Sequence, residues 1–174
     1  HDIEYLFPLT DLEIDVLDRN RAVFKQNRIV LCMPSSQTLA IARNKYVLYK
    51  TFEYDDLVPS ISTYLSGEVP ITLLPAIAKP YNGRSSEGVL RISNVKELEE
   101  VSSKSGYIFQ EIIEGPVFTV DYIRNSYTDK DFSIVREELL RTKNGAGTTV
   151  RMSNDMSLKR LVSHCLLYTS DAAD

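Results

Sequence analysis

At the start of the chain, short continuous runs of hydrophobic residues alternate with segments in which hydrophobic residues recur at helical spacing. Two such runs, at residues 3–9 and 28–34, predict buried strands because neither leaves a polar face on an extended chain. Between them, Thr10 and Glu13 have the spacing of a capping box, and the apolar residues that follow recur at helical intervals. Strand, helix and strand in this order predict the last part of a small α/β domain over residues 1–34.

A longer helical stripe follows. Its apolar positions run from Leu39 to Phe52 at helical spacing, which predicts one helix with an inward-facing side. Ser35 and Ser36 precede this stripe, and a serine hydroxyl can accept a hydrogen bond from the first backbone amides of a helix. Residues 59–70 are interpreted as a connecting segment after this helix.

Three apolar runs and one helical pattern make up the middle of the chain. The runs at residues 74–80, 89–92 and 107–113 predict strands. Residues 94–104 predict a helix that crosses between the second and third of them. We therefore expect residues 35–114 to form one lobe of strands and helices.

Strict alternation replaces the apolar runs in the last part of the chain. Residues 117–123 alternate between apolar and polar side chains, as a strand with one buried face does. Residues 132–140 predict its neighbour, and the glycine-containing segment 141–150 is interpreted as a hairpin in preference to a phosphate-binding loop. These strands and a following helix predict a second lobe over residues 115–164. Residues 165–174 break the pattern and are interpreted as a non-native tail of an incomplete reading frame.

Composition and charge narrow the class of protein. The chain has 174 residues, of which 43% are hydrophobic and 25% charged, an ordinary globular composition. Its net charge is −4, which argues against a general nucleic-acid or anionic-membrane surface. Cys32, Cys165, His1 and His164 are too few and too scattered for a disulfide framework or a structural zinc site. With no signal peptide and no long apolar run, we expect a cytoplasmic protein.

One lysine and the loop after it carry the clearest chemistry. Lys79 precedes Pro80, so its backbone is held extended and its ammonium is fixed at a strand end. Gly83 and Gly88 permit close backbone approach, and the residues between them offer donors that could surround an anion. The loop lacks the Gly-Lys-Ser/Thr ending of a P-loop, and by itself it favours an ordinary hairpin turn.

The order of the segments around the loop strengthens the case for an anion-binding site. A lysine-bearing strand, a small-residue loop, a return strand, a helix and the run Gln-Glu-Ile-Ile-Glu-Gly at residues 110–115 follow one another. Over residues 38–162 this arrangement resembles the ATP-grasp superfamily, and in particular carboxylate–amine ligases like the large chain of carbamoyl-phosphate synthase. The resemblance implies an α+β fold of two ATP-grasp lobes, truncated here, preceded by the end of a Rossmann-like α/β domain.

The same resemblance implies roles for individual residues. Lysines and the loop would hold the phosphates of ATP, and the strand that leads to the hinge would hold adenine. Read on its own, a helix lysine such as Lys45 is usually a solvated surface residue, and Glu111 and Glu114 could be a solvated strand end. The implied ATP-binding residues are Lys45, Lys79, Gly83, Arg84, Ser85, Ser86, Gly88, Gln110, Glu111, Ile113 and Glu114, and Arg136 is implied to contact the phosphorylated substrate.

One position departs from the family pattern. Relatives commonly carry a glutamate two residues after the hinge glycine, where it binds the ribose hydroxyls. Here Val117 follows Gly115 and Pro116 at that place. The resemblance therefore implies weaker ATP binding than in relatives that carry the glutamate.

The implied reaction joins a carboxylate to an amine. ATP would phosphorylate the carboxylate to an acyl phosphate, which the amine then attacks. The implied cofactors are ATP and Mg²⁺, and the implied partners are small-molecule carboxylate and amine substrates, without nucleic acid or membrane. A homodimer of the complete protein is also possible.

Magnesium ligands and rival functions limit this interpretation. The Glu-x-Asn pair that would hold Mg²⁺ in the family does not occur after Val150, so no metal ligand is assigned and this chain alone is expected to be inactive. A nucleotide-binding or regulatory domain without catalysis is the alternative function. A structural α+β domain with an unrelated loop is the third.

Overall fold

The computed structural model of the chain describes residues 3–125, 128, 130–143 and 145–170. It begins with the unit β1 (Tyr5–Leu6), α1 (Asp11–Arg19), α2 (Arg21–Gln26) and β2 (Val30–Leu31). The two strands pair in parallel, as a strand–helix–strand unit requires. This N-terminal unit confirms the predicted order of elements.

The strands of the N-terminal unit are shorter and more exposed than predicted. Tyr5 is 60% exposed and Val30 is 52% exposed, so the expectation of buried strands is wrong for the described part of the chain. The pair has only two strands, and neither strand has a neighbour on its other edge among the described residues. The capping box is confirmed: the Glu13 amide donates to the Thr10 hydroxyl at 3.3 Å, and the Glu13 carboxylate accepts from the Thr10 amide at 2.9 Å.

The long helix predicted between Leu39 and Phe52 is divided in two. The structure has α3 (Ser36–Ala42) and α4 (Lys45–Phe52), with a break at Asn44. The Asn44 side chain accepts hydrogen bonds from the second and third amides of α4, at 3.0 and 3.2 Å. Asparagine competes with the backbone in this way and favours helix ends over interiors. This break places Lys45 at the start of a helix.

The first sheet is antiparallel and has the order β3-β6-β4-β5. Its core is small and apolar: Ala76, Ala78, Phe109 and Ile92 are at most 1% exposed, and α5 packs on them through Leu98. The predicted strands and crossover helix are present, whereas β3 lies in the segment that was predicted to be a connector. The elements are β3 (Thr63–Leu65), a short 3-10 helix (Ile71–Leu73), β4 (Ala76–Pro80), β5 (Leu90–Ile92), α5 (Val95–Ser102) and β6 (Tyr107–Glu111).

The second sheet is an antiparallel meander of β7 (Val117–Asn125), β8 (Lys130–Arg141) and β9 (Gly147–Ser153). The predicted hairpin between β8 and β9 is confirmed. The last helix, α6 (Met156–Ser170), packs on β7 and β8 and also touches α3. Val135 in the middle of β8 is fully buried.

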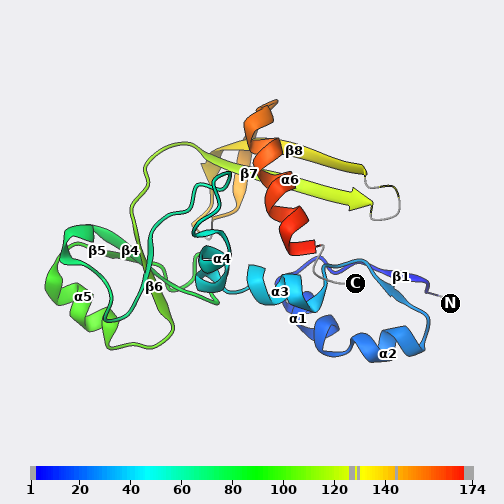
Figure 1. Ribbon diagram of the computed structural model, residues 1–174, viewed down its shortest axis with the longest axis horizontal. Coiled ribbons are helices and arrows are strands. Elements are labelled where there is room, and N and C mark those ends of the chain that lie inside the picture. Colours follow the sequence, from blue (N-terminus) through cyan, green and yellow to red (C-terminus); the bar gives the residue numbers. More distant parts are fainter. Residues whose placement is uncertain (1–2, 126–127, 129, 144, 171–174) are drawn as a thin grey trace.

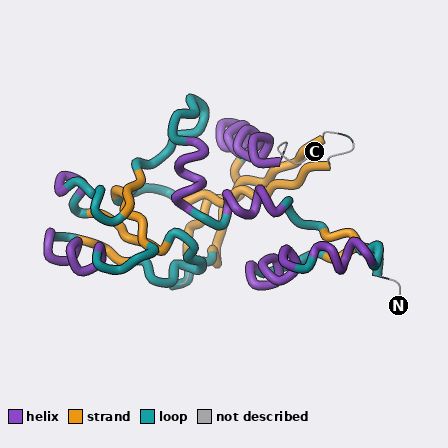
Figure 2. The backbone as a smooth tube through the Cα atoms, turned by 60° about the horizontal axis from the view of Figure 1, so that its bottom comes forward, coloured by secondary structure: helices purple, strands orange, loops and turns teal. Residues whose placement is uncertain are grey.

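Helices lie between the first sheet and the N-terminal unit. Figure 1 shows the first sheet with α5 at one end of the molecule, the N-terminal unit at the other, and α4 and α3 between them. Both views show the N-terminal unit joined to the rest through the segment that leads into α3 (Figure 2). The molecule is thus a mixed helix-and-sheet structure with two separate antiparallel sheets, and the predicted α+β class is confirmed.

Candidate functional site

The candidate site is a polar cavity of about 380 Å³ where three segments meet. The segments are the end of β4, the start of α4 and the end of β8. The loop between β4 and β5 lies against all of them. The lining residues are Lys45, Ile77, Lys79, Pro80, Gly83, Arg84, Ser85, Ser86, Glu87, Val89 and Arg141.

Lys79 is held by its strand. It lies on β4 opposite Ile108 of the central strand β6, one residue after the fully buried Ala78. Burial lowers the pKa of the Lys79 ammonium, and the nearby Lys45 lowers that pKa further. Within the described residues Lys79 has no ion-pair partner. The cavity therefore carries a partly buried positive charge that the described residues leave unpaired.

Lys45 joins the start of α4 to the loop. Its ammonium donates to the Gly83 carbonyl at 2.5 Å, and its backbone amide donates to the Tyr81 carbonyl at 2.9 Å. Burial is the main reason that the pKa of Lys45 is lowered, and the charge of Arg43 adds to it while Asp11 opposes it. The break at Asn44 makes Lys45 the first residue of α4.

The loop combines tight turns with positive backbone angles. Ser85 and Ser86 both have φ above +50°, a conformation that costs non-glycine residues roughly 1–2 kcal/mol each. Gly88 has φ +72°, and a Cβ there would lie 2.9 Å from the Pro80 ring. The loop does connect two antiparallel neighbours, as an ordinary hairpin turn would. Its strained serines nevertheless line the cavity, and such strain is common at functional sites.

A second, mainly apolar cavity of about 470 Å³ adjoins the first. Lys45 and Lys79 line both cavities. Gln110 and Thr63 are the buried polar residues that line the apolar cavity, and the side-chain nitrogen of Gln110 donates to the Thr63 hydroxyl at 2.6 Å. The other lining residues are Leu48, Tyr49, Phe52, Val58, Pro59, Ser60, Ile61 and Cys165.

Arg141 brings a further cation to the polar cavity, this one from the second sheet. Its guanidinium donates to the Gly145 carbonyl at 2.9 Å and forms an ion pair with Glu138 at 2.6 Å. The turn it braces lies against the loop, since a Cβ on Gly145 would be 2.9 Å from the Ser86 hydroxyl. Sequence analysis missed Arg141. Its place beside a glycine-containing turn was the available signal, but the contact between the two sheets is not visible in the sequence.

Comparison with known protein families identifies one whose members match this part of the chain. A family described as "ATP-grasp domain" matches residues 42–166. The chain belongs to the ATP-grasp family. The match includes both antiparallel sheets, both cavities and all of the cations that line the polar cavity, Lys45, Lys79, Arg84 and Arg141.

Solved ATP-grasp structures share the fold. N5-carboxyaminoimidazole ribonucleotide synthetase from Thermotoga maritima has a TM-score of 0.63 and 20% identity, and the match covers 97% of this chain and 44% of that one. D-alanine-D-alanine ligase from Coxiella burnetii has a TM-score of 0.70 and 12% identity, covering 98% of this chain and 52% of that one. The biotin carboxylase domain of Hydrogenobacter thermophilus 2-oxoglutarate carboxylase, in complex with MgADP, ADP and bicarbonate, has a TM-score of 0.71 and 12% identity, covering 96% and 42%.

These matches show the fold. The present chain corresponds to about half of the length of each of these solved chains. A comparison with curated protein sequences finds no match. The ATP-grasp chain contains no helix, among the residues that the structure describes, that is long and apolar enough to cross a membrane.

The structure gathers most of the predicted ATP-binding residues of this ATP-grasp chain. Gly88 forms the base of the loop, and Gln110 lines the apolar cavity. Glu111, Ile113 and Glu114 are exposed at and after the end of β6, outside the lining of both cavities. The residues that line the polar cavity as a group are Lys45, Lys79, Gly83, Arg84, Ser85 and Ser86.

Arg136 lies apart from these residues. It sits near the middle of β8, where its guanidinium holds Asp121 of β7 through contacts of 2.8 and 2.9 Å. It does not line either cavity. Its charge is thus already paired across the sheet, whereas Arg141 reaches the polar cavity.

A magnesium site is not evident in the part of the chain that the structure describes. No group of three or more His, Cys, Asp or Glu side chains there could hold a metal ion. Mg²⁺ prefers oxygen ligands and usually keeps waters and phosphate oxygens in its shell. We therefore assign no metal ligand and no step to a metal ion.

Proposed function

We propose that this chain is the ATP-binding part of an ATP-dependent ligase that joins a carboxylate to an amine. One observation carries the proposal: Lys45 and Lys79 stand at the junction of a polar and an apolar cavity. ATP has the same division, with a polyanionic triphosphate at one end and a flat base at the other. The triphosphate would lie under the loop, and adenine would enter the apolar cavity.

Electrostatics favour an anion in the polar cavity. The pKa values of Lys45 and Lys79 are both lowered, so each ammonium is held charged at a cost. Arg84 and Arg141 add two more positive charges, and Glu87 is the single carboxylate among the described residues that line the cavity. A bound triphosphate would relieve the repulsion between the cations.

The base end offers a specific contact. Gln110 donates its amide hydrogen to Thr63, which leaves its carbonyl oxygen able to accept from the exocyclic amine of adenine. We propose that Glu111 and Glu114, with the backbone of Ile113, complete this end where the chain leaves β6. Their exposure is compatible with contact to a ligand.

The chemistry follows from phosphoryl transfer. A carboxylate oxygen attacks the γ-phosphorus, ADP leaves, and the acyl phosphate is then attacked by the amine with release of phosphate. Lys45, Lys79 and Arg141 would neutralise charge on the transferred group, an electrostatic and positioning role. The names of the solved relatives, a synthetase, a ligase and a carboxylase, support this class. The finer likeness to carbamoyl-phosphate synthase is carried by the sequence resemblance alone, and Arg136 remains a proposal for the substrate side.

Calorimetric titration tests the nucleotide site. Lys79→Ala should weaken ATP binding by at least about tenfold, because it removes a charge-assisted hydrogen bond, and should leave adenosine binding nearly unchanged. Lys96→Ala, at an exposed lysine of α5, is the matched control and should bind ATP like the original chain. Equal losses for ATP and adenosine would remove Lys79 from the phosphate end.

Product analysis separates the ligase from its alternative. The complete protein with MgATP, a carboxylate and an amine should release ADP and phosphate only when the carboxylate is present. A nucleotide-binding domain without catalysis would bind ATP as tightly and release neither product.

A further inference from the structure

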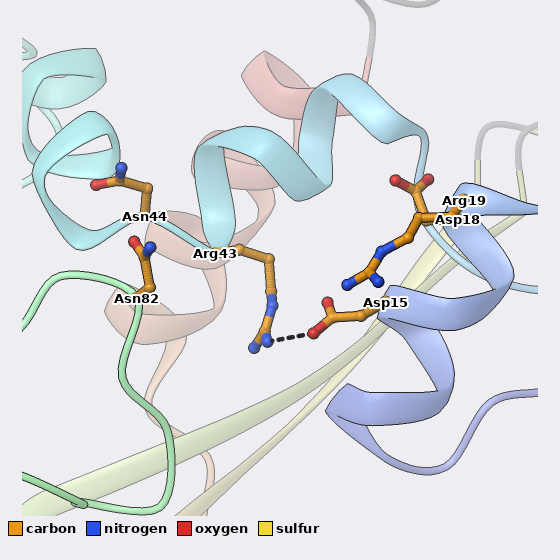
Figure 3. Close-up of a pocket in the computed structure, with 6 residues that line it drawn as sticks. All are labelled: Asp15, Asp18, Arg19, Arg43, Asn44 and Asn82. Carbon is orange, nitrogen blue, oxygen red and sulfur yellow. Dashed lines mark hydrogen bonds and ion pairs between the residues drawn. The ribbon is translucent and has the colours of Figure 1, made fainter.

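A third cavity, of about 390 Å³, adjoins the phosphate end of the proposed site. Two of its lining residues, Asn44 and Asn82, directly precede Lys45 and Gly83, which are themselves hydrogen-bonded. The rest of its lining comes from α1 and from the end of α3 (Figure 3). We call it the mixed-charge cavity, and it is lined by Asp15, Asp18, Arg19, Arg43, Asn44 and Asn82.

Some of the charged side chains of this cavity form contacts that hold the N-terminal unit against α3. Arg43 forms ion pairs with Asp15 at 3.0 Å and with Asp11 at 3.2 Å. One oxygen of Asp18 accepts from Arg21 and from the Ser36 hydroxyl, both at 2.7 Å. These contacts fix the two cavity carboxylates, and each uses a single carboxylate oxygen.

Other polar groups of the cavity have no protein partner. Among the described residues, the second oxygen of Asp15, the Arg19 guanidinium and the Asn82 side chain form no hydrogen bond or ion pair. Figure 3 shows Asn44 and Asn82 on one side of Arg43, and Asp15 and Arg19 together on its other side. One oxygen of the Asp15 carboxylate and the Arg19 guanidinium thus remain able to contact a ligand in one cavity.

We propose that the mixed-charge cavity binds a free α-amino acid as the amine substrate of the ligase. Arg19 would hold the carboxylate, since a guanidinium matches carboxylate geometry, and Asp15 would accept from the ammonium. Asn82 would contact the amino acid next to the loop. Because Asn44 and Asn82 directly precede Lys45 and Gly83, the bound amino acid would lie next to the place where the acyl phosphate would form. The inference rests on the proposed function, because it assigns a substrate class to that reaction.

Binding of amino acids tests the proposal directly. The common free amino acids are titrated at millimolar concentration into the ¹⁵N-labelled chain, with and without a non-hydrolysable ATP analogue, and followed by NMR. At least one should shift the amide signals of Asp15, Arg19 and Asn82, and its N-acetyl and carboxamide derivatives should bind at least about tenfold more weakly. No binding by any amino acid in either state, or equal binding of the derivatives, would overturn the inference.

Matched variants separate a binding site from a structural brace. Asp15→Asn and Asp11→Asn each remove one of the two carboxylates that hold Arg43, but Asp15 alone lines the cavity. Amino-acid affinity should fall about tenfold or more in Asp15→Asn and stay unchanged in Asp11→Asn. Equal effects of the two variants would show a brace only.

Arginine variants test the proposed contact with the carboxylate of the amino acid. ATP titration of the same variants distinguishes failure of the amino-acid site from failure of the proposed ATP site. Arg19→Gln should weaken amino-acid binding and leave ATP binding intact, whereas Arg91→Gln, at an exposed arginine of β5, should change neither. Unchanged amino-acid affinity in Arg19→Gln would contradict the assigned orientation. Amino-acid binding without ATP binding would contradict the proposed function while leaving the amino-acid site in place.

Discussion

Glu138 and Arg141 form an ion pair of 2.6 Å although both belong to β8 and are three residues apart. An odd separation places side chains on opposite faces of a regular strand. The pairing of β8 with β9 shifts register on both sides of Leu140, and this irregularity turns the two side chains toward each other. Glu138 is only 9% exposed and also accepts from the Thr119 hydroxyl, so it is a firm anchor for Arg141.

Glu138→Gln should therefore lower ATP affinity without touching the nucleotide directly. Arg141 would lose its charged partner and reach the polar cavity less often, and a partly exposed ion pair contributes up to about 1 kcal/mol, or about fivefold in affinity. Glu137→Gln is the matched control, because Glu137 pairs with Arg151 at 3.4 Å and neither residue lines the polar cavity. Calorimetric titration with ATP should separate the two variants, and equal affinities would argue against positioning by Glu138.

Lys79→Met should stabilise the chain in the absence of nucleotide while weakening ATP binding. The pKa of Lys79 is lowered in the folded state, so the folded state holds the charged form at a cost that the unfolded chain does not bear. That cost is present in full below the folded pKa. It disappears as the pH rises from the folded pKa to the ordinary lysine value, because the folded state then releases the proton first.

Thermal unfolding over a range of pH measures this effect. The Tm of Lys79→Met should exceed that of the original chain by a few degrees at neutral pH, and the difference should shrink as the pH approaches the ordinary pKa of lysine. Lys96→Met, at an exposed position on α5, serves as the control and should show no such trend. A destabilised Lys79→Met variant would indicate that the lysine makes favourable contacts in the free chain.

Gly88→Ala should destabilise the chain more than Gly67→Ala. Both glycines have positive φ, +72° and +86°, so alanine pays a backbone cost of about 1 kcal/mol at either position. At Gly88 the new Cβ would also lie 2.9 Å from the Pro80 ring, whereas at Gly67 nothing lies within 4 Å. Urea unfolding should show a larger loss of unfolding free energy for Gly88→Ala, and equal losses would mean that the loop moves aside easily.

Local signals in the sequence predicted much of the fold. The Thr10–Glu13 capping box is a contact between near neighbours, and the structure confirms it. Asn94 likewise accepts from the Glu97 amide at 3.0 Å at the start of α5. The break at Asn44 escaped prediction because the apolar stripe continues across it, and only the asparagine side chain signals the new helix.

Contacts between distant segments account for what the sequence did not reveal. The three-residue strand β3 is too short for a periodic pattern, and it exists because it pairs with β6, where Thr63 meets Gln110. Arg141 enters the candidate site through a register shift and through the approach of Gly145 to Ser86. Neither the shift nor the approach leaves a trace in the order of residues.

Val117 provides the last test, because its neighbours are now known. It is 38% exposed and lies directly opposite Glu138, on the same face of the second sheet as Thr119. A glutamate at this position would therefore stand beside the Glu138 carboxylate. Cross-strand like charges are destabilising, so Val117→Glu should cost some tenths of a kcal/mol of unfolding free energy to about 1 kcal/mol.

If position 117 contacts the ribose, Val117→Glu should still bind ATP more tightly. A charge-assisted hydrogen bond contributes about 1.5–3 kcal/mol, or roughly 10- to 100-fold in affinity, and the cost of the like charges reduces that gain. The gain should be much smaller for an ATP analogue that lacks both ribose hydroxyls. Val117→Gln is the control, since it can accept a hydrogen bond without adding charge beside Glu138, and it should gain less affinity but lose less stability. Equal gains for ATP and the analogue would place Val117 away from the ribose and require the hinge after β6 to be assigned anew.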